Sequence, residues 1–200
     1  MKKALIGIVI LLLAGCGGPA KNVKESEGST AGSRLVMMSD GYIDEAGKGQ
    51  DAQMSQLNPW VEIDRKSGIA GYMGVTMTRV VADPEIFSTH APRWLWISQN
   101  DEMRINVGNK TVVLTALEEG KRWHKNQEDS AGYRTTTYFE TVRFQASASD
   151  MEILAAGPIT QISVSGQKGG TLWPRQGRTV LKDYQPKFSK FYKENIAASL

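Results

Sequence analysis

Short runs of alternating apolar and polar residues fill the middle of the 200-residue chain and predict β-strands. Residues 61–64 read Val-Glu-Ile-Asp, and residues 73–78 read Met-Gly-Val-Thr-Met-Thr. Such alternation is typical of half-buried strands, which turn one face to the core and the other to water. Residues 94–97 read Trp-Leu-Trp-Ile. This run is apolar at every position, so it predicts a strand over Arg93–Ser98 that is covered on both faces.

The next run contains the clearest local signal, a β-hairpin. Residues 103–107 alternate between apolar and polar, Gly108-Asn109 is a turn signal, and residues 110–115 read Lys-Thr-Val-Val-Leu-Thr. A longer strand, rich in threonine and aromatic residues, is predicted over Thr135–Ala146.

A short helix is predicted near residues 149–156. Ser149 and Glu152 have the spacing of a capping box, in which the two side chains satisfy free amides of the first turn reciprocally. Gly157 and the proline after it end this helix. A further strand should follow, with Ile162 and Val164 facing inward.

The C-terminal residues predict an amphipathic helix. Pro186 suits its first turn, and one apolar stripe follows, formed by Phe188, Phe191, Tyr192 and Ile196. Three lysines lie off that stripe, at positions 187, 190 and 193. We expect the aromatic side chains to dock on the sheet and the lysines to face water; the alternative is insertion into a membrane interface.

Together these elements predict an α+β fold. Strands outnumber helices and come in runs without βαβ alternation, and no repeat recurs at a fixed period. We therefore expect an antiparallel sheet or partly closed barrel, with a short helix near 149–156 and a C-terminal amphipathic helix packed on it.

The first residues have a different pattern, which indicates export. Lys2 and Lys3 precede an apolar run from Ala4 to Ala14, the layout of a secretory signal peptide. The run is shorter than the ~20 residues that a membrane-spanning helix needs.

Leu13-Ala14-Gly15-Cys16 at the end of this run resembles the lipobox of bacterial lipoproteins. The resemblance implies that residues 1–15 are cleaved and that Cys16 becomes an N-terminus carrying a diacylglyceryl thioether and an amide-linked acyl chain. Two or three chains would hold the protein stably on a membrane. Because Gly17, and not aspartate, follows the cysteine, the resemblance implies an outer-membrane location facing the periplasm if the host is Gram-negative.

Residues 17–34 predict a flexible tether. They are rich in Gly, Ser, Lys and Glu and nearly empty of large apolar residues. The predicted organisation is thus a signal peptide (1–15), a lipidated cysteine with its tether (16–34) and one globular β-rich domain (35–200).

Charge argues against nucleic acid as a partner. The formal charge of +3 includes Lys2 and Lys3, so the mature chain would be near +1. Basic residues are concentrated after Gly166, where the sequence contains seven Lys or Arg and only two acidic residues. We interpret them as a solvated helix face; the alternative is contact with anionic lipid or cell-wall polymer.

No motif names a reaction or a cofactor. His90 and His124 lie in no hydrolase signature, although a catalytic role for either remains an alternative. Residues 40–51 lack the turn glycine and the final glutamate of a calcium loop, and no histidine or cysteine pair has metal-ligand spacing. We expect no metal and no cofactor.

One recurring association is tryptophan beside cationic residues. Flat aromatic faces can stack on sugars, and cations can pair with carboxylate or phosphate, so an anionic glycan would suit this composition. The alternative is that the tryptophans are core residues with basic neighbours reaching out to water. The candidate binding residues are Arg93, Trp94, Arg122, Trp123, Trp173 and Arg175.

The favoured hypothesis is a membrane-anchored envelope lipoprotein whose non-catalytic domain binds an envelope protein or an anionic cell-wall polymer. Two alternatives remain: a membrane-tethered hydrolase acting on envelope components, and a structural subunit of a secretion or surface assembly.

Overall fold

A computed structural model describes residues 22–43, 55–84, 92–173 and 184–200. These residues form strands and helices in the following order: β1 (Val23–Glu27), β2 (Ser33–Met38), β3 (Gln56–Asp64), β4 (Ala70–Pro84), β5 (Glu102–Val107), β6 (Lys110–Ala116), β7 (Lys121–Glu128), β8 (Arg134–Gln145), α1 (Ala148–Ala156), β9 (Ile159–Gly166), β10 (Gly169–Trp173) and α2 (Tyr184–Phe191). After α2 the helix continues as a π-helical turn over Tyr192–Ile196 and a 3₁₀ turn over Ala197–Ser199.

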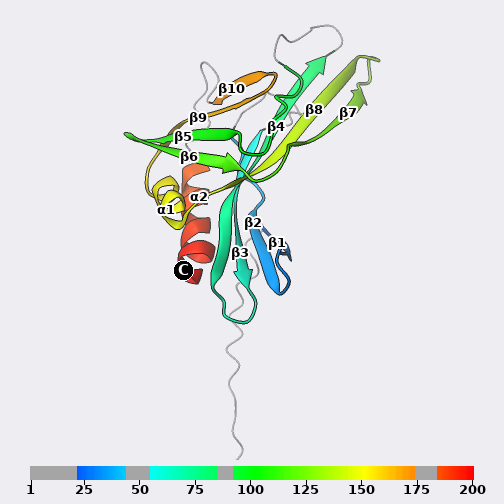
Figure 1. The fold of residues 1–200 in the computed structure, drawn as a ribbon. Coiled ribbons are helices and arrows are strands. Elements are labelled where there is room, and N and C mark those ends of the chain that lie inside the picture. Colours follow the sequence, from blue (N-terminus) through cyan, green and yellow to red (C-terminus); the bar gives the residue numbers. More distant parts are fainter. Residues whose placement is uncertain (1–21, 44–54, 85–91, 174–183) are drawn as a thin grey trace, which may run out of the picture.

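All ten strands belong to one antiparallel sheet, which confirms the predicted β-rich class. The strand order is β1-β2-β3-β4-β8-β6-β5-β9-β10, and β7 pairs with β8 beside this path. The sheet is not closed, so of the two predicted architectures the open sheet is correct. Helices α1 and α2 lie side by side against one side of it (Figure 1).

The core lies between these helices and the sheet. Phe188, Phe191 and Ile196 are buried, which confirms the predicted apolar stripe of the C-terminal helix. Tyr184, which the stripe did not include, is also buried. Burial raises the pKa of its hydroxyl well above the ordinary value, so this side chain stays neutral at physiological pH.

Several local predictions are confirmed with small shifts. The hairpin joins β5 to β6 through Gly108-Asn109, with Val107 opposite Lys110. Gly108 has a φ of 58°, which glycine adopts without a steric penalty. Helix α1 exists, but its capping box is formed by Ser147 and Asp150, two residues before the predicted start.

The predicted polar face of residues 61–64 is wrong for Glu62, which is buried together with its apolar neighbours. Its carboxylate accepts hydrogen bonds from Ser29 at 2.8 Å and Ser33 at 3.5 Å. Both serines come from the hairpin between β1 and β2, which packs beside β3. The local alternation could not predict this covering, because the covering residues lie about thirty positions away.

The predicted flexible tether is wrong for residues 23–34, because β1 lies inside that range. All five of its residues pair with β2, from Val23 opposite Met38 to Glu27 opposite Arg34. Only Val23 is partly buried against the core; the other four residues are exposed. The composition therefore correctly excluded a core contribution from most of this segment. Backbone pairing, which composition does not report, orders it as an edge strand.

The predicted strand over Arg93–Ser98 is also wrong. These residues form no strand, and Trp96 has a φ of 59°, outside the β region. Their backbone groups find other partners. The carbonyls of Leu95, Trp96 and Ile97 accept hydrogen bonds from the amides of Lys168, Gln167 and Gly120. Residues 92–98, hereafter the 92–98 segment, thus form backbone hydrogen bonds with neighbouring residues of the domain without being a strand of the sheet.

Strand β7 continues the path of β6 along one edge of β8. Residues 115–116 of β6 pair with residues 144–145 of β8, and residues 121–128 of β7 pair with residues 134–141. On the opposite edge of β8, residues 74–84 of β4 pair with residues 135–145 of β8. Residues 79–84 of β4, strand β7 and residues 134–141 of β8 therefore extend from the body as a three-stranded unit, hereafter the arm (Figure 1).

Candidate functional site

The arm brings together four of the six residues that the sequence suggested as binding residues: Arg93, Trp94, Arg122 and Trp123. Register places Arg79, Glu140 and Arg122 opposite one another on its three strands, and Val80, Phe139 and Trp123 in the next row. Because successive strand residues point to opposite faces, the two rows lie on different faces of the arm. We call them the charged face and the aromatic face.

A buried carboxylate organises the charged face. The side chain of Glu140 is fully buried, and Arg79 is 2% exposed. Arg122 lies on the other side, with its Nη1 atom 3.8 Å from Glu140 Oε1. A carboxylate without partners would be costly at this depth, and the Arg122 guanidinium together with two backbone amides offsets that cost.

Glu140 also holds the 92–98 segment against the arm. Its Oε2 accepts from the amide of Leu95 at 2.6 Å, and its Oε1 accepts from the amide of Ile97 at 3.0 Å. Arg79 donates to the carbonyls of Pro92 and Arg93, at 2.8 and 3.1 Å. The side chains of Glu140 and Arg79 thus satisfy backbone amides and carbonyls of the 92–98 segment that a neighbouring strand would otherwise satisfy.

The first predicted pair, Arg93 and Trp94, is used for contacts within the protein. Trp94 Nε1 donates to the carbonyl of Phe139 at 3.1 Å, and its ring meets Tyr138 edge-on at 5.1 Å. The Arg93 guanidinium lies 5.2 Å from the centre of the Tyr138 ring and 3.3 Å from Asp83. These two residues fasten the 92–98 segment to the arm.

Arg122 is also engaged, on the charged face. Its guanidinium lies 4.1 Å from the centre of the Trp96 ring, and it forms an ion pair with Glu119. Its side chain is only 18% exposed. Arg122 therefore joins the 92–98 segment to β7, and little of its charge is directed to solvent.

Trp123 differs from these residues, because it lies on the aromatic face and remains open to solvent. Its ring stacks on Phe139 with 5.1 Å between centres and an angle of 2° between the planes. We call this pair the aromatic stack. Trp123 is 45% exposed, so one large apolar surface has no cover among the described residues. Lys121 and Lys125, two positions to either side, point to the same face and are exposed.

The structure places the other predicted residues elsewhere. Trp173 is fully buried in the core, where it offers no surface to a ligand, so the core alternative holds for this residue. Arg175, Cys16 and His90 lie outside the described residues. His124 is exposed on β7, with its ring 6.0 Å from that of Tyr138.

Sequence reasoning missed Glu140 and Phe139. Both lie within the predicted strand Thr135–Ala146, in the run Tyr-Phe-Glu-Thr. A glutamate preceded by two aromatic residues in a long strand is a weak signal of burial, and only the register with β4 and β7 makes it specific.

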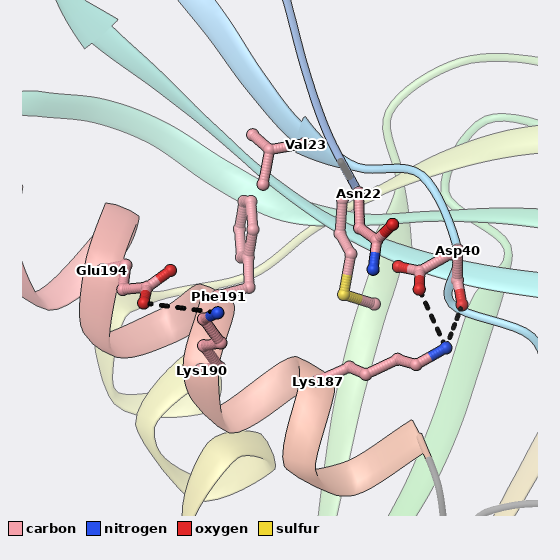
Figure 2. A pocket seen from close by; sticks show the side chains of 8 residues that line it. Asn22, Val23, Asp40, Lys187, Lys190, Phe191 and Glu194 are labelled. Carbon is pink, nitrogen blue, oxygen red and sulfur yellow. Dashed lines mark hydrogen bonds and ion pairs between the residues drawn. The ribbon is translucent and has the colours of Figure 1, made fainter. Parts of the chain in front are cut away.

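A hollow of about 60 Å³ lies away from the arm, between α2 and the ends of β1 and β2 (Figure 2). Met38, Val23 and Phe191 supply its apolar lining. Lys187 Nζ lies 2.8 Å from Asp40 Oδ2, and Lys190 Nζ lies 3.8 Å from Glu194 Oε1. The hollow has room for only a few water molecules, and both lysines have carboxylate partners, so it offers a ligand less than the aromatic face does.

Within the part of the chain that the structure describes, no group of three or more His, Cys, Asp or Glu residues could hold a metal ion. No helix among the described residues is long and apolar enough to cross a membrane. No family model, no curated protein and no solved structure matches the chain. The arm must therefore be interpreted from its own chemistry.

Proposed function

We propose that the protein is a lipid-anchored component of the bacterial cell envelope, and that its folded domain is a non-catalytic binding module. The aromatic face of the arm is its contact surface. The observation that carries this proposal is the exposed aromatic stack of Trp123 and Phe139 between two lysines.

An exposed tryptophan fixed against a second ring is costly in water and useful in an interface. Tryptophan supplies a large contact area with few rotatable bonds, and binding energy concentrates at such residues. The flanking Lys121 and Lys125 favour an anionic partner, because opposite charges across an interface guide and orient the encounter. The chemistry of the face thus suits an acidic protein surface or an anionic cell-wall polymer.

Packing on the charged face makes the contact surface on the opposite side of the arm rigid. Glu140, Arg79 and the 92–98 segment pack on the opposite side of the same three strands, so β7 has a stiff backing over residues 122–124. A rigid contact surface loses less conformational entropy when it binds.

The membrane part of the proposal rests on the lipobox resemblance of residues 13–16. Replacing Cys16 with serine should remove the thiol that receives the lipid. We expect the variant to accumulate as unprocessed precursor, and any product released from its signal peptide to leave the membrane fraction. The measurement is cell fractionation with mass spectrometry of the N-terminus. Normal processing with unchanged membrane association would refute the anchor.

The binding part is tested by replacing Trp123 with alanine. Full-length protein in detergent is immobilised, and envelope proteins and purified cell-wall sacculi are offered in parallel. We expect the wild type to retain one of the two, and Trp123→Ala to lose at least about tenfold of that retention, the range of an interface hot spot. The variant should still fold, with a free energy of unfolding lower by about 1–2 kcal/mol, because the substitution also removes the stacking on Phe139.

Tyr72→Ala is the matched control, because Tyr72 is a 55% exposed aromatic residue on β4, outside the arm. It should retain the bound component at the wild-type level. Equal losses in both variants, or no loss in Trp123→Ala, would contradict the assignment of the aromatic face.

A further inference from the structure

We infer that the outer edge of β7 is a strand-addition site, and that its occupant is an extended acidic segment of a protein partner. This inference rests on the proposed function and deepens it, because it names the partner's chemistry and the backbone groups that hold it.

The first support is the open edge itself. β7 pairs with β8 over eight consecutive residues without a register shift, and no other described strand pairs with it. In an antiparallel strand, every second residue turns its N–H and C=O away from the neighbour. β7 therefore presents unused donors and acceptors over about 26 Å, at 3.3 Å per residue. Such an edge is a template for an added strand.

The second support is what β7 lacks. Proteins block open edges with proline, bulges, very short strands or charged side chains. The other open edges among the described strands are shorter: β1 and β10 have five residues each, and β10 begins with two glycines. The stretches of β4 and β6 that pair on one side only are residues 79–84, which end in a proline, and residues 110–114. β7 has eight residues and no proline, glycine or bulge. Its only protection is charge, and the exposed Lys121 and Lys125 make that charge positive over residues 121–125. That protection repels basic strands and attracts acidic ones.

The third support is the order of side chains on the aromatic face. An added strand places its residues directly opposite those of β7, where cross-strand pairs interact. Lys121, Trp123 and Lys125 would then meet three alternate positions of the partner, and acidic, apolar and acidic residues are their complements. The apolar residue would cover the exposed ring of Trp123.

The probe for this site is a blocked eight-residue peptide, (Glu-Thr-Val-Thr)₂, whose alternate positions on one face read Glu, Val, Glu. Full-length protein in detergent is titrated with it calorimetrically, and amide hydrogen exchange is measured with and without peptide. We expect saturable binding and slower exchange of alternate β7 amides, with β1 and β10 unchanged. Two further peptides carry N-methyl groups on alternate amides, one on the odd-numbered residues and the other on the even-numbered residues. One of these two peptides should bind about tenfold or more weakly, because several backbone hydrogen bonds are lost.

A charge reversal tests the side-chain order. The double variant Lys121→Glu with Lys125→Glu should reject (Glu-Thr-Val-Thr)₂ and bind (Lys-Thr-Val-Thr)₂ instead. The matched control is Lys24→Glu with Lys168→Glu, which reverses two exposed lysines on or beside the other edge strands and should keep the wild-type preference.

Several results would overturn the inference. Equal binding of the two N-methylated peptides would show that the backbone edge is not used. Protection of β7 that rises with protein concentration alone would make a second copy of this chain the occupant. Failure of (Glu-Thr-Val-Thr)₂ to bind, while sacculus or protein retention still requires Trp123, would reject strand addition and leave the proposed function intact. Loss of both would reject the two together.

Discussion

Replacing Glu140 with alanine is expected to lower the free energy of unfolding by about 3–5 kcal/mol, the cost of breaking a buried ion pair from one side. Glu140 is fully buried, and its Oε1 atom lies 3.8 Å from Arg122 Nη1. Without this carboxylate, Arg122, whose side chain is only 18% exposed, loses its buried ion-pair partner. The amides of Leu95 and Ile97 lose their acceptor at the same time.

The measurement is urea unfolding followed by circular dichroism, combined with amide hydrogen exchange. The exchange of Leu95 and Ile97 should accelerate well below the unfolding transition, because these two amides are held by Glu140 alone among the described residues. Glu140→Gln preserves the side-chain volume, so this variant should fold. The amides of Leu95 and Ile97 should still exchange faster in it than in the wild type. Glu119→Ala is the control: Glu119 pairs with the same Arg122 but is 67% exposed, so its loss should cost less than about 1 kcal/mol. A loss below about 1 kcal/mol for Glu140→Ala would contradict the role assigned to it.

Replacing Trp173 with alanine should cost a similar amount, about 3–5 kcal/mol, as expected for a large aromatic side chain removed from a packed core. Trp173 is fully buried at the end of β10, opposite Ile162. The cavity left behind cannot be filled without moving the strand. Thermal and urea unfolding measure the loss directly.

The comparison with Trp123→Ala makes this prediction specific. Both residues were suggested as binding residues from the sequence, but one is in the core and the other is on the arm. Trp173→Ala should lose stability, and Trp173→Phe should recover part of it. Trp123→Ala should lose binding, and it should lose less stability than Trp173→Ala because its ring is covered on one side only. A Trp173→Ala variant with wild-type stability would contradict the burial of this side chain.

Local patterns predicted elements well where both determinants lie in the same short stretch. The hairpin of residues 103–115 has its alternation and its turn in thirteen residues, and the structure has it as predicted. The 92–98 segment shows the opposite case. Its apolar run favoured a strand, but its amides are held by Glu140, which lies about 45 positions away in the chain. No window of sequence contains both partners.

The candidate site was predicted in the same partial way. The association of tryptophan with basic residues led to two residues of the arm and to two residues of the 92–98 segment that pack on it, because aromatic and cationic side chains do gather there. It could not assign them to faces, since adjacent residues such as Arg122 and Trp123 point in opposite directions. It also could not identify Phe139 as the ring beneath Trp123, because that pairing depends on register.

The pairing of β1 with β2 also limits how far the domain can travel from a membrane. With Cys16 as the lipid anchor, six residue steps lead to Asn22, where the described fold begins, and six steps span at most about 20 Å. A tether through Arg34 would have allowed about 60 Å. Because a lipid anchor diffuses in the membrane plane, a threefold shorter reach confines the domain to a layer about threefold thinner, which raises its concentration in that layer about threefold. The domain would therefore meet partners at the membrane surface and would not reach partners deeper in the envelope.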